Sequence, residues 1–286
     1  MRRLDVFLVL TIALGLMTSG IAQGGTAATD IDLSKSPTAQ AVKARNELRA
    51  GIVPQTGVSY KDPNSGQLIG WALTIARDGG QRLGVQKVTF VESSWDGIIA
   101  GLQANKYDIA TASLFETDQR KQAIDFVDVW NSGVCFLALK NNTKVNTFED
   151  LKSPSVKIAT AQGSGSEQIV KKEFSKAQIV SVPTTGGSGA PIEMVLSGRT
   201  DASQVDDHVS DAWVKRYCEL KLIPPDCFKE KPYKMATGWG VNKGDSVWQD
   251  FWQRVVKDHE QFIQDERAKF TRFEYLFPGE KPPVCK

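Results

Sequence analysis

The sequence predicts an α/β protein built on parallel or mixed sheets, and three observations support this. Apolar runs typical of strands alternate with helical patterns along most of the chain. With 286 residues, the chain is long enough for one large or two smaller domains. Trp95, Ser113 and Arg120 follow or end predicted strands, where ligands bind in α/β folds.

The N-terminus has the three-part form of a secretory signal. A pair of arginines precedes an apolar run over residues 6–17, and small residues follow. The run is too short to span a bilayer. We expect residues 1–22 to be a signal peptide cut after Ala22, with Ala27 or Ala28 as alternatives, and the protein to be periplasmic. Residues 23–37 lack periodicity and are expected to form a flexible leader.

The first half of the chain is predicted to form three helices and three strands. Apolar residues recur at helical spacing from Gly70 onward, and glycines end that pattern near Leu83. The continuous apolar runs on either side are typical of buried strands. We expect helices over residues 38–46, 70–83 and 95–104, and strands over residues 48–53, 87–91 and 108–113.

A second round of alternation begins at residue 134 and ends near residue 206. Residues 134–139 are too continuously apolar to be a loop. We expect further strands at 156–161 and 178–182 and from Asp201, and helices at 166–174 and 191–196. Residues 248–270 predict a C-terminal helical region whose apolar stripe contains His259, which we interpret as a packing or surface residue.

Composition narrows the chemistry. The formal net charge of +2 gives no reason to expect a nucleic-acid partner. Four cysteines in an exported chain favour disulfides, and their spacing fits no zinc site, so we expect neither a metal nor a cofactor. Cys218 and Cys227 flank a segment that reads as a turn and are expected to pair. Cys135 and Cys285 remain, and they could pair only if the C-terminal tail returns to Cys135.

The segment from Ser113 to Arg120 predicts a site for an anion. A strand ends at Ser113, and Thr117 has the position of an N-cap for a short helix that contains Arg120. A guanidinium beside the free N–H groups of a strand-to-helix junction matches the geometry of a carboxylate. The alternative is that Arg120 is an ordinary solvated helix residue.

Three motifs place these residues in a known pattern. They are Trp95-Asp96-Gly97-Ile98-Ile99-Ala100-Gly101-Leu102, Lys106-Tyr107-Asp108, and Ser113 followed by Thr117-Asp118-Gln119-Arg120. Their order and spacing resemble the family 3 periplasmic solute-binding proteins, receptors that supply amino acids and related small acids to ABC importers. The resemblance extends from Ala44-Arg45-Asn46-Glu47-Leu48-Arg49-Ala50-Gly51 to Gly238-Trp239-Gly240-Val241.

The resemblance implies the type II periplasmic-binding-protein fold. In that fold each of two lobes is a mixed sheet flanked by helices, and two crossing strands join the lobes. It implies that residues 38–133 and 238–286 form lobe 1 and that residues 134–237 form lobe 2. The expected partners are a small-molecule ligand, either an amino acid or an organic acid, and the membrane permease of an ABC importer. We expect a monomer.

The resemblance also assigns roles to residues. Arg120 would bind the ligand carboxylate, and Asp206, at the end of a G-R-x-D-A-x-x-x-D pattern, would face the α-ammonium; Asp207 is the alternative one residue away. Ser164, Gly165 and Ser166 lie in a glycine-rich loop that would present N–H groups to a carboxylate, with Ser166 capping the next helix.

Two open questions concern Trp95 and the ligand. Trp95 would be either an aromatic wall for the ligand or a core tryptophan. Val53 stands where binders of basic amino acids often have an acid, so a cationic side chain would lack a partner. We therefore expect a neutral or small polar amino acid, or a non-amino organic acid.

A binding protein without covalent chemistry is the preferred hypothesis, and two alternatives remain. Some relatives of this family dehydrate cyclohexadienyl acids, and Glu116 or Glu167 could serve as the general acid. Against this, the sequence contains no nucleophile elbow or paired catalytic signature. The second alternative is a sensor that keeps the pocket but acts on a partner other than a transporter.

Overall fold

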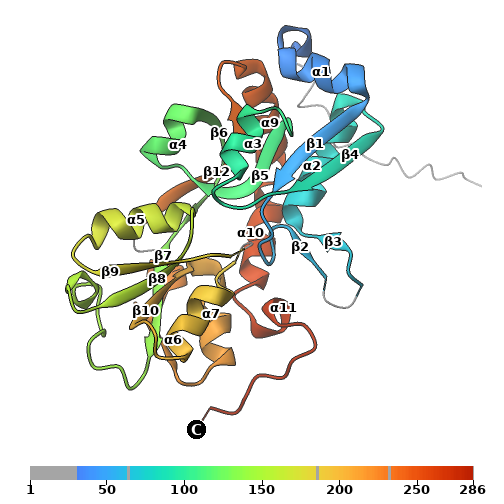
Figure 1. The fold of residues 1–286 in the computed structure, drawn as a ribbon. Helices are drawn as coiled ribbons and strands as arrows, with labels where there is room; N and C mark the ends of the chain where they lie inside the picture. The colour runs from blue at the N-terminus through green and yellow to red at the C-terminus, as the bar shows by residue number, and fades with distance from the viewer. Residues whose placement is uncertain (1–30, 63–64, 185–186, 231–232, 286) are drawn as a thin grey trace, which may run out of the picture.

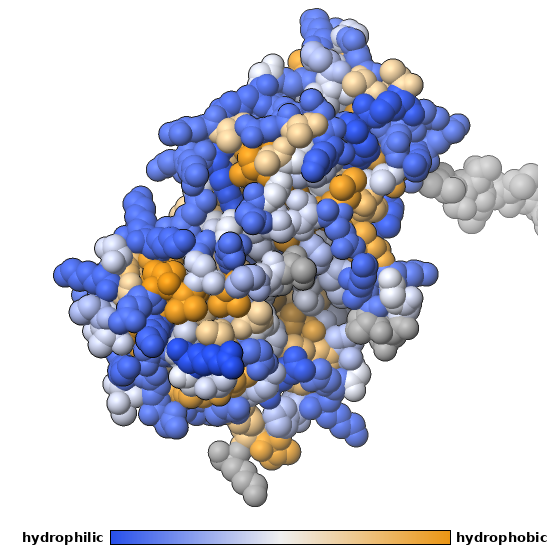
Figure 2. Space-filling view, in the orientation of Figure 1, coloured by the Kyte–Doolittle hydropathy of each residue, from blue (hydrophilic) through white to orange (hydrophobic). Residues whose placement is uncertain are grey.

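The computed structural model describes residues 31–62, 65–184, 187–230 and 233–285, which form two lobes, one above the other in Figure 1. The expected signal peptide lies outside the described residues, as do residues 23–30 of the expected leader. Among the described helices, none is both long enough and apolar enough to cross a membrane. The face in Figure 2 is mostly hydrophilic, as expected for a protein surface in water.

Lobe 1 contains a five-stranded mixed sheet with the order β4-β1-β5-β12-β6. The strand β1 pairs in parallel with β4 and β5, whereas β12 runs antiparallel to β5 and β6. The bounds are β1 (Glu47–Ile52), β4 (Lys87–Glu92), β5 (Ile109–Phe115), β6 (Ile124–Ser132) and β12 (Met235–Asn242). A two-stranded ribbon, β2 (Tyr60–Lys61) and β3 (Leu68–Ile69), lies outside this sheet.

Helices cover the lobe 1 sheet and close its core. They are α1 (Pro37–Arg45), α2 (Trp71–Leu83), α3 (Ile98–Gln103), α4 (Asp118–Ala123) and α9 (Ser246–Asp258). The helix α9 buries Phe251, Trp252, Val255 and Val256 in one cluster with residues of β1 and α2, as its sequence stripe predicts. Gly79 makes this packing possible, because a Cβ there would lie 2.3 Å from the Trp252 ring.

Lobe 2 contains a second five-stranded mixed sheet with the order β11-β7-β10-β8-β9. The strand β7 is antiparallel to β10 and β11, and β8 is parallel to β9 and β10. The strands are β7 (Val134–Leu139), β8 (Lys157–Ala161), β9 (Gln178–Val182), β10 (Ala202–Asp206) and β11 (Leu220–Ile223). The helices are α5 (Gly165–Glu173), α6 (Gly189–Leu196), α7 (Asp207–Arg216) and α8 (Cys227–Glu230), with a 3-10 turn η2 (Asp150–Lys152).

The two lobes are joined by crossing segments, and the predicted fold class is thereby confirmed. The strand β6 of lobe 1 is separated from β7 of lobe 2 by Gly133 alone. The chain returns between α8 and β12, next to the position expected from the sequence. A register shift between Thr237 and Gly238 interrupts the pairing of β12 with β6 near this crossing.

The end of the chain differs from the expected division into lobes. The helix α10 (Glu260–Lys269) follows α9 downward in Figure 1 and leads to α11 (Phe273–Leu276) beside lobe 2. Phe270, Phe273, Leu276 and Phe277 belong to the same buried cluster as Leu137 and Val205 of lobe 2. Residues 238–286 therefore do not pack on lobe 1 alone, because these four side chains complete the core of lobe 2.

The expected disulfides are wrong. The structure pairs Cys135 with Cys227 and Cys218 with Cys285, not Cys218 with Cys227 or Cys135 with Cys285. The segment between Cys218 and Cys227 contains the extended strand β11, which separates the two thiols instead of turning them together. The strand β11 pairs with β7, which carries Cys135. Cys218 lies two residues after the end of α7, the helix against which α11 packs.

The last residues of the expected leader are ordered. A 3-10 turn, η1 (Leu33–Lys35), is followed by Ser36, whose hydroxyl donates to Asp245 Oδ2 at 2.7 Å. Ser36 also caps α1, since its side chain accepts a hydrogen bond from Ala39 N. The N-terminal end of the described chain is therefore attached to α9.

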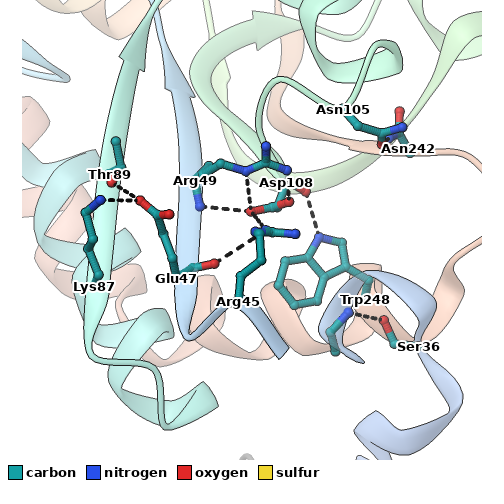
Figure 3. A network of polar contacts seen from close by, with 11 residues as sticks. Ser36, Arg45, Glu47, Arg49, Lys87, Thr89, Asn105, Asp108, Asn242 and Trp248 are labelled. Carbon is teal, nitrogen blue, oxygen red and sulfur yellow. Dashed lines mark hydrogen bonds and ion pairs between the residues drawn. The ribbon is translucent and has the colours of Figure 1, made fainter. Parts of the chain in front are cut away.

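The motif residues Tyr107 and Asp108 have structural roles in lobe 1. Arg45 and Arg49 converge on the Asp108 carboxylate at 2.7 and 2.9 Å, as Figure 3 shows. Trp248 Nε1 donates to the Asp108 carbonyl at 3.0 Å and so attaches α9 to the start of β5. Gly101 leaves room for Tyr107, because a Cβ there would lie 2.4 Å from the phenol oxygen. Two residues of the family motifs thus position β5, and the candidate site begins at the end of this strand.

Candidate ligand-binding site

A small cavity of about 20 Å³ lies where the two lobes meet. The residues that line it come from β5, the crossing strands, the N-terminal ends of α5 and α7, and the loops after β1 and before α3. They are Gln55, Trp95, Ser113, Phe115, Trp130, Ser132, Ser164, Gly165, Ser166, Asp206, His208 and Thr237. All the predicted site residues except Arg120 are in this set. A cavity of this size holds about one water molecule, so the lobes are closed on each other.

Arg120 lies beside the cavity, behind the wall formed by Phe115 and Gly165. Its helix begins as predicted, with Thr117 Oγ1 accepting from Arg120 N at 3.4 Å. Arg120 is 3% exposed, and its guanidinium donates to the carbonyls of Phe115 and Gly163 at 3.2 and 3.3 Å. A Cβ at Gly165 would lie 2.9 Å from Arg120 Nη1, so the loop of lobe 2 rests directly on this cation.

No carboxylate of the described residues forms an ion pair with Arg120. Burial alone accounts for the shift of its pKa, which falls to about 10, and no neighbouring charge counters it. A buried guanidinium with two carbonyl partners retains unused donors, and a charge in this position is costly without a counter-ion. The site therefore favours an anion that reaches Arg120.

The glycine-rich loop before α5 packs on lobe 1. Gly163 has a φ of +74°, and a Cβ there would lie 2.8 Å from the Asp96 backbone, so only glycine allows this approach. The cap of α5 is Ser164, whose Oγ accepts from Glu167 N at 3.0 Å, and not Ser166 as expected. The helix begins at Gly165, one residue earlier than predicted, and its N-cap lies two residues before the expected one.

Asp206 and Asp207 have different surroundings. Asp206 lines the cavity and accepts hydrogen bonds from Gln55 Nε2 and Gln204 Nε2, both at 3.1 Å. Burial raises the pKa of Asp206. Asp207 is fully buried away from the cavity and forms an ion pair with Arg267 of α10 at 3.2 Å. Asp206 is thus the acid that a ligand could reach.

Several polar atoms of the cavity wall have no hydrogen-bond partner among the described residues. They are Gln55 Oε1, Ser113 Oγ and Trp130 Nε1, together with His208 Nδ1, which lies 3.7 Å from Asp207 Oδ1, beyond hydrogen-bond distance. Buried polar atoms are normally paired, so these atoms mark a place where a polar ligand or water completes the network. Sequence reasoning missed Gln55, Trp130 and His208. The position of His208, two residues after Asp206 in the first turn of α7, was the available signal.

Neither glutamate named for the dehydratase alternative lines the cavity. Burial alone would raise the pKa of Glu167, but hydrogen bonds from Ser181, Lys171 and Gly163 hold it below its ordinary value. A carboxylate that stays ionised is a poor general acid. Burial raises the pKa of Glu116, but that carboxyl faces a separate groove lined by residues of β6 and α9.

The described residues contain no cluster of three or more metal-binding side chains. The cavity itself offers hydrogen-bonding groups and the Asp206 carboxyl group, and the buried guanidinium of Arg120 lies beside it. These features suit recognition of a small ligand with a carboxylate, held between two lobes.

Two mixed sheets joined by crossing strands, with a closed cavity between them, define a type II periplasmic binding protein. The chain belongs to family 3 of the bacterial extracellular solute-binding proteins, whose family model matches residues 48–271. The resemblance predicted from the motifs is confirmed.

Curated relatives in this family are named as amino-acid-binding proteins. The histidine-binding periplasmic protein of Escherichia coli K12 is 28% identical over 216 residues, which cover 74% of this chain and 81% of that protein. The ABC transporter glutamine-binding protein GlnH of Bacillus subtilis is 25% identical over 217 residues, covering 75% of this chain and 76% of GlnH.

Solved structures show the same fold. The ancestral amino acid-binding protein AncCDT-1, a precursor of cyclohexadienyl dehydratase, has a TM-score of 0.70 and 30% identity, covering 82% of this chain and 100% of that chain. An amino acid ABC transporter substrate-binding protein, AbpA of Streptococcus pneumoniae, bound to L-arginine, has a TM-score of 0.70 at 20% identity, covering 85% of this chain and 100% of that chain.

Proposed function

We propose that this protein is a periplasmic receptor that binds an α-amino acid between its lobes and delivers it to the permease of an ABC importer. The observation that carries the proposal is the buried Arg120, which has no counter-charge, combined with Asp206 on the other lobe. A free amino acid has a carboxylate and an ammonium group on one carbon atom. The two residues offer an opposite charge to each.

Each lobe contributes one half of this recognition. Arg120 belongs to α4 of lobe 1, and Asp206 ends β10 of lobe 2. The ligand would therefore join the lobes, which is how a receptor of this class can couple binding to closure. The polar atoms that lack partners on Ser113, Trp130 and His208 would accept or donate the remaining hydrogen bonds.

Two further features support the assignment. The histidine- and glutamine-binding relatives are named as binding proteins, and their ligands are amino acids. Residues of the family motifs also position the elements of the site: Asp108 anchors the start of β5, and Thr117 caps α4. We further propose export through the N-terminal signal, cleavage at Ala22, and action as a monomer.

The dehydratase alternative is favoured by one observation, the similarity to AncCDT-1, which is described as a precursor of such an enzyme. The positions of Glu116 and Glu167 outside the cavity support the receptor instead. Asp206 is the carboxyl group that lines the cavity, and the receptor proposal assigns it to the ammonium group.

A thermal-shift screen tests the proposal. The exported protein and its Arg120→Ala variant would be heated with α-amino acids, aromatic acids and small organic acids. A ligand at a hundred times its Kd stabilises the native state by about 2.7 kcal/mol. We expect such a shift for at least one α-amino acid with the parent protein and none with Arg120→Ala. Turnover of a cyclohexadienyl acid, with no stabilisation by any amino acid, would replace the receptor by the enzyme.

A further inference from the structure

A second pocket continues from the cavity past Asp206. It has a volume of about 240 Å³ and shares Gln55, Asp206 and His208 with the cavity. The shared residues lie at the point where the proposed function places the α-ammonium group. A group attached to the α-carbon of a bound amino acid can therefore extend from Asp206 into this pocket.

The far wall of the pocket is apolar and aromatic. Val209 and Trp213 of α7 form one part, and Leu276 and Phe277 at the end of α11 form the other. Trp213 packs edge-on against Phe277 with ring centroids 4.9 Å apart. Among the described residues that line the pocket, Asp206 is the one carboxylate, and none is a lysine or an arginine. The wall thus offers contact area without a partner for a second charge.

The part of the wall formed by α11 is attached to lobe 2. The disulfide between Cys218 and Cys285 encloses this segment, and Arg216 pairs with Glu280 at 2.9 Å. The guanidinium of Arg216 also lies 4.2 Å from the centroid of the Phe277 ring, on which it packs. Leu276 and Phe277 are 8% and 7% exposed, so they are held in the core and not on a loose tail.

The family model ends at residue 271, whereas the wall residues Leu276 and Phe277 follow it. This pocket is therefore completed by a C-terminal addition to the part of the chain that matches the family. The ligand's carboxylate and ammonium groups would be recognised by family positions, and its side chain by α7 together with this addition.

We propose that this pocket receives the side chain of the bound amino acid and that the ligand is a neutral α-amino acid with a bulky apolar or aromatic side chain. The inference rests on the proposed function, since Asp206 must hold the ammonium group for the side chain to enter here. A cationic side chain would place a second positive group where the described lining residues offer no second acid.

The first test is a calorimetric comparison of L-leucine and L-phenylalanine with glycine, L-alanine and L-arginine on the full exported chain. We expect leucine or phenylalanine to bind at least tenfold more tightly than glycine and alanine. Tighter binding of L-arginine, or equal binding of alanine and leucine, would overturn the assignment of the pocket.

The second test fills the pocket. A Cβ on Gly189 would have Trp213 as its nearest neighbour, at 3.8 Å, which is an ordinary van der Waals distance, so this lining position beside the aromatic wall has room for a Cβ. Gly189→Leu should weaken leucine and phenylalanine at least tenfold and change alanine by less than threefold. The adjacent Ala190 is exposed and does not line the pocket, so Ala190→Leu is the matched control and should change none of these affinities.

The outcomes separate this inference from the proposed function. If amino acids bind in a manner that Arg120→Ala abolishes, but Gly189→Leu leaves the affinity for large side chains unchanged, the pocket assignment fails and the receptor remains. If no amino acid binds the parent protein, both fail. Selective loss of large side chains in Gly189→Leu supports both.

Discussion

Gln55 Nε2 donates a hydrogen bond of 3.1 Å to Asp206 Oδ2, and this bond joins lobe 1 to lobe 2 in the cavity. A second bond between the lobes runs from Arg120 to the carbonyl of Gly163. Both residues proposed to hold the ligand are therefore engaged across the interface when the lobes are closed. A bound amino acid would replace these contacts with stronger charge-assisted bonds.

Arg120→Ala is expected to weaken the binding of any carboxylate ligand by about 3 kcal/mol or more, because two charge-assisted hydrogen bonds are lost in a buried place. Arg120→Lys should also bind weakly, since an ammonium group cannot reproduce the planar fork. Calorimetry measures both, and Lys121→Ala on the same helix is the exposed control. Unchanged affinity in Arg120→Ala would remove this residue from the site.

Arg267→Met is expected to destabilise the protein by about 3 to 5 kcal/mol, because Asp207 is left as a buried charge without its partner. Urea denaturation gives the difference in the free energy of unfolding. Arg272→Met provides the control, since its side chain is 52% exposed. Equal losses in the two variants would show that the Asp207 ion pair has no special role.

Peptide mapping of the unreduced protein shows which cysteines are linked. We expect Cys135 linked to Cys227 and Cys218 linked to Cys285. Replacing Cys285 with serine should cost roughly 2 to 4 kcal/mol of stability, because a long loop is released in the unfolded chain. A peptide containing Cys218 joined to Cys227 would contradict the structure.

Glu116→Gln is expected to raise the urea midpoint at pH 7. Burial raises the pKa of Glu116 in the folded protein, so the ionised form is destabilising there. The stability that comes from its neutral form is fully present below the unfolded pKa of about 4.3 and is lost as pH rises through the folded pKa.

The gain from Glu116→Gln should therefore disappear at pH 4. Glu116 forms an ion pair with Lys121 at 3.1 Å. Glu149→Gln is the matched control, because Glu149 likewise pairs with a lysine, Lys152, but has a side chain 80% exposed. It should show no gain at either pH. A gain from Glu116→Gln that is the same at pH 4 and pH 7 would exclude ionisation of Glu116 as its cause.

The alternation of strands and helices could be predicted because the buried strands are short, continuous apolar runs. The cap Thr117 and the strand Gln178–Val182 match the sequence prediction for the same reason: local chemistry determines them. The two lobes were predicted from the family resemblance of the motifs. Two motif residues, Tyr107 and Asp108, position β5 through contacts that composition alone does not reveal.

The features that were missed depend on contacts distant in sequence. The disulfide pairing follows from β11 lying beside β7 and from α11 packing on α7. The spacing of the cysteines in the sequence predicts neither contact. The roles of Asp206 and Asp207 could not be separated by motif, because the distinction comes from Arg267, 60 residues farther along the chain than Asp207. The apolar pocket likewise requires Leu276 and Phe277 to return to α7.

Recognition of both ends of an amino acid by Arg120 and Asp206 is tested most directly by calorimetry on Asp206→Asn. The ligands are the α-amino acid that binds the parent protein most tightly and its counterpart without the amine. We expect the amino acid to lose about 2 to 4 kcal/mol, because its buried cation loses the opposing charge, and the amine-free acid to bind as well or better. Parent-like affinity of Asp206→Asn for the amino acid would contradict the account.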